Sequence, residues 1–135
     1  MDISMTELEF RRLLDMAYIG NWILNSTRGT DRFVDYDIVE SKLFSYCTTC
    51  GMDTLSHSCG GVIKPSAAYE NGGIHEAIAD YEDSVFFEIL AEELARRDMD
   101  FEPISSENYG ELTTRIDEYI EEFEQNGIDN ISLDK

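Results

Sequence analysis

Apolar residues recur every three or four positions through the first part of the chain, a spacing typical of an amphipathic helix. Thr6 and Glu9 occupy the positions of a capping box, in which each side chain hydrogen-bonds a free backbone N–H at the start of a helix. The polar run Asn25–Gly29 interrupts the pattern. We therefore expect a helix over residues 6–26, whose apolar positions face the core: Phe10, Leu13, Leu14, Ala17, Tyr18, Trp22 and Leu24.

A second stretch with helical spacing follows after Asp35 and Asp37, either of which can cap a helix. Its apolar positions are Val39, Leu43, Tyr46, Cys47 and Cys50, and Gly51 is a suitable C-terminal cap. Residues 51–73 contain five of the nine glycines and show no sustained period. This segment is expected to be a long loop, which in a compact domain is either functional or mobile.

Two further helices are predicted in the second half of the chain. Apolar spacing predicts a helix over residues 74–98, either continuous or kinked or split at Asp80–Ser84. After Pro103, a helix beginning at Ser105 or Ser106 is expected to end at Gly127, followed by a short tail over residues 128–135. Because no segment alternates apolar and polar residues, the sequence predicts an all-α fold: a four-helix bundle-like single domain over residues 1–135.

Two of these helices carry motifs that resemble a known group of proteins. One motif is the run from Leu13 to Trp22, and the other runs from Tyr81 to Asp98, with Val85-Phe86-Phe87 at its centre. Together they resemble small, acidic, helical bacterial proteins of unassigned function. The resemblance implies a helical fold and brings no catalytic residues, and it does not include the cysteine segment.

The charge of the chain narrows the range of partners. Twenty-nine acidic and ten basic residues give a net charge of −19, and residues 61–135 contribute −15 of it. Direct binding to nucleic acid or to anionic membranes needs a cationic face, which this composition does not supply. The acidic N-terminus is unlike a signal peptide, no apolar run is long enough to span a membrane, and three cysteines cannot all pair. A cytoplasmic location is therefore expected.

One cluster of side chains has the composition of a zinc site. Cys47 and Cys50 are separated by two residues, and His57 and Cys59 follow, so the segment offers three thiolates and an imidazole. The alternative is that Cys47 and Cys50 are small apolar residues in phase with Leu43 and Tyr46. A zinc-stabilised helical domain is thus one hypothesis for the chain.

The other hypothesis rests on the carboxylates. Acidic residues repeat at i, i+4 spacing on the third and fourth predicted helices, at Glu76, Asp80, Glu88 and Glu92, then at Asp117, Glu118, Glu121 and Glu122. Such a step advances about 6 Å along a helix, comparable with the distance between neighbouring phosphates of a nucleic-acid strand. These carboxylates are expected either to be a solvated surface or to bind a basic protein. The first expectation for function is a non-enzymatic interaction module that binds a basic protein surface. Phage anti-restriction and anti-CRISPR proteins, which inhibit nucleic-acid-handling enzymes, have a similar size and charge.

Overall fold

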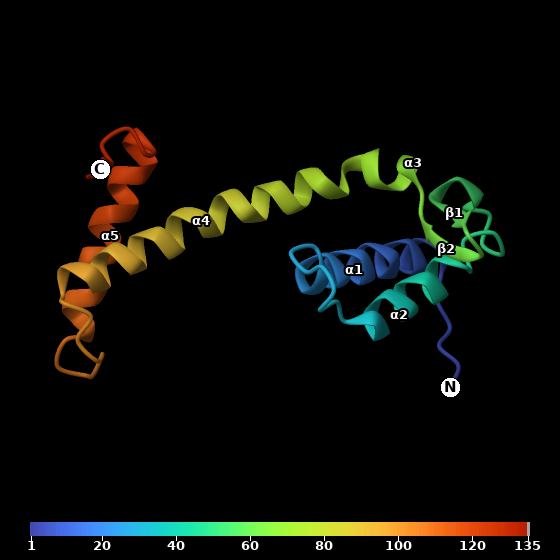
Figure 1. The fold of residues 1–135 in the computed structure, drawn as a ribbon, viewed down its shortest axis with the longest axis horizontal. Helices are drawn as coiled ribbons and strands as arrows, with labels where there is room; N and C mark the ends of the chain where they lie inside the picture. The colour runs from blue at the N-terminus through green and yellow to red at the C-terminus, as the bar shows by residue number, and fades with distance from the viewer. Residues whose placement is uncertain (135) are drawn as a thin grey trace. The chain divides into compact units, whose positions relative to one another are not determined.

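The computed structural model describes residues 1–134, and its contacts divide the chain into two compact units, residues 1–78 and residues 79 onward (Figure 1). The first unit contains helix α1 (Glu7–Asn25), helix α2 (Val34–Phe44), strands β1 (Ser56–Cys59) and β2 (Val62–Pro65), and the short helix α3 (Ala67–Tyr69). Helix α4 (His75–Asp98) begins in the first unit and continues into the second, which also contains α5 (Tyr109–Asn126).

Helix α1 begins where the capping box predicts. The backbone N–H of Glu9 donates to Thr6 Oγ1 at 3.2 Å, and the backbone N–H of Thr6 donates to Glu9 Oε2 at 2.8 Å. Both bonds satisfy donors that have no partner within the helix. The prediction of a helix over residues 6–26 is confirmed, with the α-helix itself ending at Asn25.

The core of the first unit is aromatic. Tyr69 of α3 packs edge to face against Tyr18 of α1 and Phe44 of α2, with ring centroids 5.2 and 5.0 Å apart. Leu14, Cys47 and Ile78 complete the buried cluster. Helix α1 packs against α2, and α2 also packs against β2 (Figure 1).

The prediction of an all-α four-helix bundle is wrong because residues 51–73 are not a structureless loop. They contain a 3₁₀ turn (Asp53–Leu55), the antiparallel β1–β2 hairpin, α3 and a five-residue π-helical turn (Glu70–Ile74). The hairpin turns on Gly60 and Gly61, both of which have positive φ, 59° and 82°. Positive φ at both residues of a two-residue turn gives the turn a twist that matches the right-handed twist of the paired strands.

The second helix is also shorter than predicted. Helix α2 ends at Phe44, and residues 45–50 form successive turns that carry Cys47 and Cys50. Gly51 closes these turns with a φ of 69°, as expected of a C-terminal glycine, although the α-helix has already ended.

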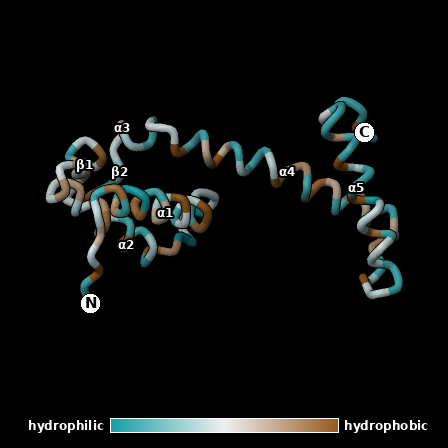
Figure 2. Tube along the Cα trace, turned by 180° about the vertical axis from the view of Figure 1, so that it is seen from behind, coloured by the Kyte–Doolittle hydropathy of each residue, from teal (hydrophilic) through white to brown (hydrophobic). Residues whose placement is uncertain are grey.

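The second unit is built from the rest of α4 and from α5. Its buried residues Ala95, Met99 and Leu112 bring the end of α4 against α5, and Phe87 contacts Phe123 with ring centroids 5.4 Å apart. Helix α4 spans residues 75–98, close to the predicted range of 74–98. Helix α5 begins at Tyr109, later than the predicted start at Ser105 or Ser106. Figure 2 shows hydrophobic and hydrophilic positions interleaved along α4. Within residues 1–134, no helix is long and apolar enough to cross a membrane.

Candidate functional site

The four residues predicted to bind zinc are not brought together. Cys47 is fully buried in the aromatic core, where burial raises the pKa of its thiol, whereas Cys59 is exposed. His57 lies on β1 opposite Lys64, and Cys50 lies in the turns after α2. Among residues 1–134, no three His, Cys, Asp or Glu side chains are close enough to hold a metal ion. Cys47 therefore acts as a small core residue in this structure.

The acidic residues predicted on the third helix lie on α4, but not in one straight row. Glu76, Asp80 and Glu88 are exposed, and Glu92 is half-buried and accepts hydrogen bonds from Arg96 at 2.7 and 3.0 Å. At 3.6 residues per turn, the eight positions from Asp80 to Glu88 add about 80° beyond two full turns. The two i, i+4 pairs therefore face different directions.

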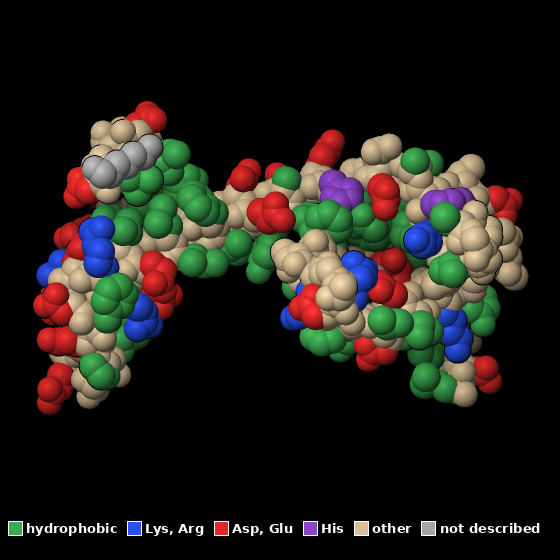
Figure 3. All heavy atoms as spheres, viewed as in Figure 1, with side chains coloured by type: hydrophobic (Ala, Val, Ile, Leu, Met, Phe, Trp, Pro, Cys, Tyr) green, Lys and Arg blue, Asp and Glu red, His purple; other side chains and the backbone are tan. Residues whose placement is uncertain are grey.

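The acidic residues predicted on the fourth helix lie on α5. Asp117 and Glu118 are exposed, Glu121 accepts a hydrogen bond from Gln125, and Glu122 accepts from Asn126 and Asn130. Figure 3 shows carboxylate side chains on the surface around this helix. These contacts are with neutral amides, so they leave the negative charges of Glu121 and Glu122 uncompensated.

The first unit contains a cleft that the sequence did not indicate. Its volume is about 680 Å³, and its walls come from α1, α2, the hairpin and α3. A smaller hollow of about 320 Å³ adjoins it, and the two share five lining residues, Tyr18, Asn21, Arg32, Glu40 and Glu70. These volumes lie in or near the range of small-molecule sites.

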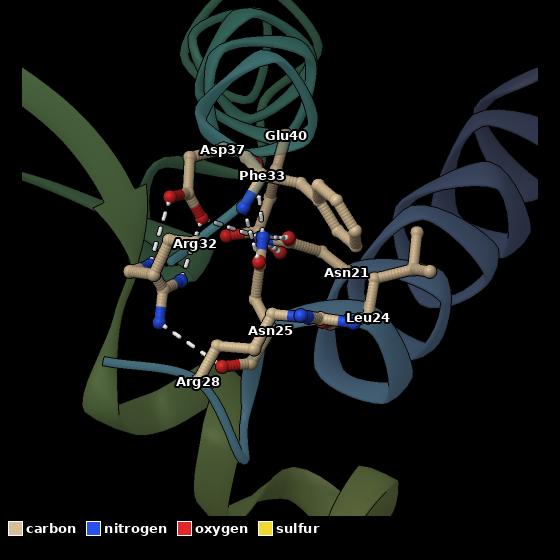
Figure 4. A network of polar contacts seen from close by, with 8 residues as sticks. All are labelled: Asn21, Leu24, Asn25, Arg28, Arg32, Phe33, Asp37 and Glu40. Atoms are coloured by element: carbon tan, nitrogen blue, oxygen red, sulfur yellow. Dashed lines mark hydrogen bonds and ion pairs between the residues drawn. The ribbon is translucent and has the colours of Figure 1, made fainter. Parts of the chain in front are cut away.

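Asn21 organises the polar wall of this cleft. It is a buried residue of α1, and its side-chain amide donates to Asp37 Oδ1 at 3.0 Å and to Glu40 Oε2 at 3.1 Å (Figure 4). Asn25, one helical turn later, donates to Asn21 Oδ1 at 2.7 Å. One amide therefore holds two carboxylates of α2 beside each other, which costs electrostatic energy unless a cation is near.

Arg32 forms an ion pair with only one of the two carboxylates. Its Nε and a terminal nitrogen bind the two oxygens of Asp37 at 3.0 and 2.8 Å, a bidentate pair that holds the pKa of Asp37 below its usual range (Figure 4). Within residues 1–134, no salt bridge reaches Glu40. Burial raises the pKa of Glu40 above its usual value, since its Asn21 hydrogen bond offsets only part of the lost solvation.

The adjoining hollow has an aromatic wall. Tyr18 and Trp22 stack one turn apart on α1 with ring centroids 6.3 Å apart, and His75 packs edge-on against Trp22 at 4.7 Å. The Tyr18 hydroxyl lies 2.6 Å from Nε2 of His75. Burial, together with the charges of Glu70 and Glu40, raises the pKa of Tyr18 to about 12. Tyr18 therefore stays protonated at neutral pH and shares this hydrogen bond with the imidazole, whose tautomer decides which group donates.

Sequence reasoning missed this cleft, although one signal was present. Asn21 and Asn25 interrupt the apolar stripe of α1 at i, i+4 spacing, on the same side of the helix as Tyr18. Polar residues at core positions require hydrogen-bond partners, so two of them predict a buried polar network. Comparison of the chain with protein-family models, with curated proteins and with solved structures finds no match.

Proposed function

We propose that the protein is a non-enzymatic interaction module that binds a basic protein surface through carboxylates of α4 and α5. One observation carries the proposal. Of the eight acidic residues singled out in the sequence, only Glu92 pairs with a basic side chain among residues 1–134. The other seven have no salt bridge among the described residues, so a cationic partner can pair with them.

The distribution of charge supports the same proposal. Residues 79–135 contain eighteen acidic and four basic residues, a net charge of −14. The three arginines among them each pair with a carboxylate of the same unit, at Glu92, Asp98 and Glu111. An excess of this size steers a cationic partner into contact and makes the association rate sensitive to salt.

The spacing of the carboxylates suggests the chemistry of the partner. Pairs separated by about 6 Å along a helix can occupy sites that a protein uses for successive phosphates. A nucleic-acid-binding protein, inhibited by occupation of its phosphate-binding groove, is therefore the partner class we propose. Because the pairs on α4 point in different directions, such a groove would have to contact more than one side of the helix.

A double charge reversal, Asp80→Lys with Glu88→Lys, tests the proposal. Each new lysine would lie four residues from a remaining glutamate, so like-charge repulsion within α4 is relieved and thermal stability is expected to stay equal or rise slightly. The partner is obtained by affinity capture with the wild-type protein at low salt. Its association rate is then measured at about 50 and 300 mM NaCl and is expected to fall about tenfold for the variant at the lower salt.

The matched control carries the same change in net charge at other exposed acids, Asp2→Lys with Asp53→Lys. It is expected to bind at a rate close to that of the wild type. Duplex DNA added as competitor should release the partner if the carboxylates occupy a phosphate groove. Equal slowing by the test and control variants would mean that only net charge matters, and an unchanged rate in the test variant would reject α4 as the binding surface.

A further inference from the structure

The cleft of the first unit has an incomplete balance of charge. It is lined by the carboxylates of Asp37, Glu40 and Glu70 and by the cations of Arg32 and Lys64, which together sum to a net charge of −1. Arg32 is committed to Asp37 by two hydrogen bonds, and Lys64 lowers the pKa of the same carboxyl. The uncompensated charge therefore belongs to Glu40 and Glu70.

Glu40 and Glu70 face the same space from different elements. Glu40 lies on α2 and Glu70 opens the π-helical turn, and both residues line both hollows. Each carboxylate raises the pKa of the Tyr18 hydroxyl, and Glu70 also raises that of Glu40, so the three groups are close enough to interact. Within residues 1–134, Glu70 makes no side-chain hydrogen bond or salt bridge.

The wall next to these carboxylates is suited to an organic cation. Tyr18 and Trp22 line the smaller hollow together with Glu40 and Glu70. The faces of aromatic rings attract ammonium and guanidinium groups, and the attraction grows when the cation is removed from water. A simple metal ion would gain less from this wall, and no cluster of three metal-binding side chains is present within residues 1–134.

We propose that this cleft binds a single organic cation, a primary ammonium or guanidinium group, between Glu40 and Glu70 and beside Tyr18 and Trp22. The bound charge would bring the cleft to neutrality and give Glu40 the cationic partner that Asp37 already has in Arg32. An anionic ligand is disfavoured, since Nε and Nη2 of Arg32 are taken by Asp37 and its Nη1 donates to the carbonyl oxygen of Asn25 at 3.3 Å.

Protonation of Glu40 would compete with the ligand. Burial favours the neutral form of this carboxyl, whereas a bound cation favours the ionised form. Binding is therefore expected to release protons and to weaken as the pH falls through the pKa of Glu40. This linkage does not involve the carboxylates of α4 and α5, so the site is independent of the function proposed above.

Two kinds of molecule carry a cationic group of this chemistry. One is a free small molecule, and the other is a protein with an exposed arginine or lysine side chain. Titration with methylguanidinium and methylammonium presents the charged group alone, whereas N-acetyl-arginine methylamide and N-acetyl-lysine methylamide present it as a protein does. N-acetyl-citrulline methylamide has nearly the shape of the arginine probe without its charge. Trp22, the only tryptophan, lies in the hollow and reports binding by fluorescence, and calorimetry provides a second measurement.

The variants Glu70→Gln and Glu40→Gln remove one charge each while keeping the side-chain shape. Saturable binding of a cationic probe is expected, with affinity at least about tenfold weaker in either variant and no binding of the citrulline probe. Glu7→Gln, an exposed position of the same unit outside the cleft, is the matched control and should bind as the wild type does. If the N-acetyl amino acid methylamides bind more tightly than methylguanidinium and methylammonium, the source of the cation is a protein side chain. If methylguanidinium or methylammonium binds more tightly, the source is a small molecule.

Three results would overturn the proposal: no saturable binding of any cation, equal binding of the citrulline probe, or full affinity in Glu70→Gln. Circular dichroism of each variant shows whether it is folded, and Glu70, being exposed, can be replaced with little risk to the fold. Because no protein partner is present in these titrations, their failure would leave the proposed role of α4 and α5 untouched.

Discussion

The residue that does most to shape the polar side of the first unit is Asn25. It is 1% exposed, and its side chain connects the end of α1 to the start of α2. Its amide donates to Asn21 Oδ1 and to the carbonyl oxygen of Phe33, and its own oxygen accepts from the backbone N–H of Phe33 at 2.8 Å. Asn25 therefore satisfies backbone groups of the loop and fixes the orientation of Asn21 in the cleft.

Replacement of Asn25 by alanine is expected to lower the free energy of unfolding by about 2–4 kcal/mol. The physical reason is that two backbone groups of Phe33 and the Asn21 oxygen would lose their partner while buried or partly buried, and each such loss costs about 1–3 kcal/mol before water and relaxation recover part of it. Urea unfolding followed by Trp22 fluorescence measures the change. Ser26→Ala is the matched control because Ser26 is the next residue along the chain, at the same helix end, and is exposed. A loss at Asn25 no larger than that at Ser26 would contradict the network.

At this scale, local contacts were predictable and distant ones were not. Thr6 and Glu9 are three residues apart, so their reciprocal hydrogen bonds follow from helix geometry alone. Asn21 and Glu40 are nineteen residues apart, and their contact depends on how α2 packs against α1. Spacing along the sequence contains no information about that packing. The sequence therefore indicated the regularly spaced carboxylates of α4 and α5 but not the cleft.

Among the elements that pattern analysis failed to find, the hairpin is the largest. Its first strand reads Ser-His-Ser-Cys, with no apolar alternation, and its strands are four residues long. The usable signal was the Gly60-Gly61 pair, since two adjacent glycines are typical of the tight turn between paired strands. The long helices α1, α4 and α5, by contrast, were predictable because apolar residues recur in them at helical spacing over several turns.

Gly61→Ala is expected to destabilise the first unit by about 1–2 kcal/mol. The φ of Gly61 is 82°, a conformation that costs an L-residue this much, and no atom would lie within 4 Å of the added Cβ, so the cost is one of backbone strain alone. Thermal unfolding followed by Trp22 fluorescence measures it. Gly29→Ala, also in open space and without positive φ, should be neutral or slightly stabilising. Equal effects at the two positions would mean that the turn does not have this conformation.

For the whole molecule, the important feature is that the two units have separate buried clusters. Leu14, Tyr18 and Phe44 belong to the first, whereas Ala95, Met99 and Leu112 belong to the second. The units also differ in charge, since residues 1–78 have a net charge of −5 and residues 79–135 one of −14. Self-repulsion therefore opposes folding of the second unit more than that of the first, and added salt should relieve it more there.

These differences lead us to expect that the two units unfold in separate transitions, which a pair of matched substitutions can test. Leu14→Ala and Leu112→Ala each remove a buried leucine side chain, and each is expected to cost about 2–5 kcal/mol in its own unit. Trp22 reports only the first unit, whereas far-ultraviolet circular dichroism reports the helices of both. Leu14→Ala should lower the fluorescence midpoint, and Leu112→Ala should lower part of the dichroism transition while leaving the fluorescence midpoint in place. If Leu112→Ala shifts both signals together, the chain unfolds as the single cooperative domain that its length predicts, and α4 transmits stability from one unit to the other.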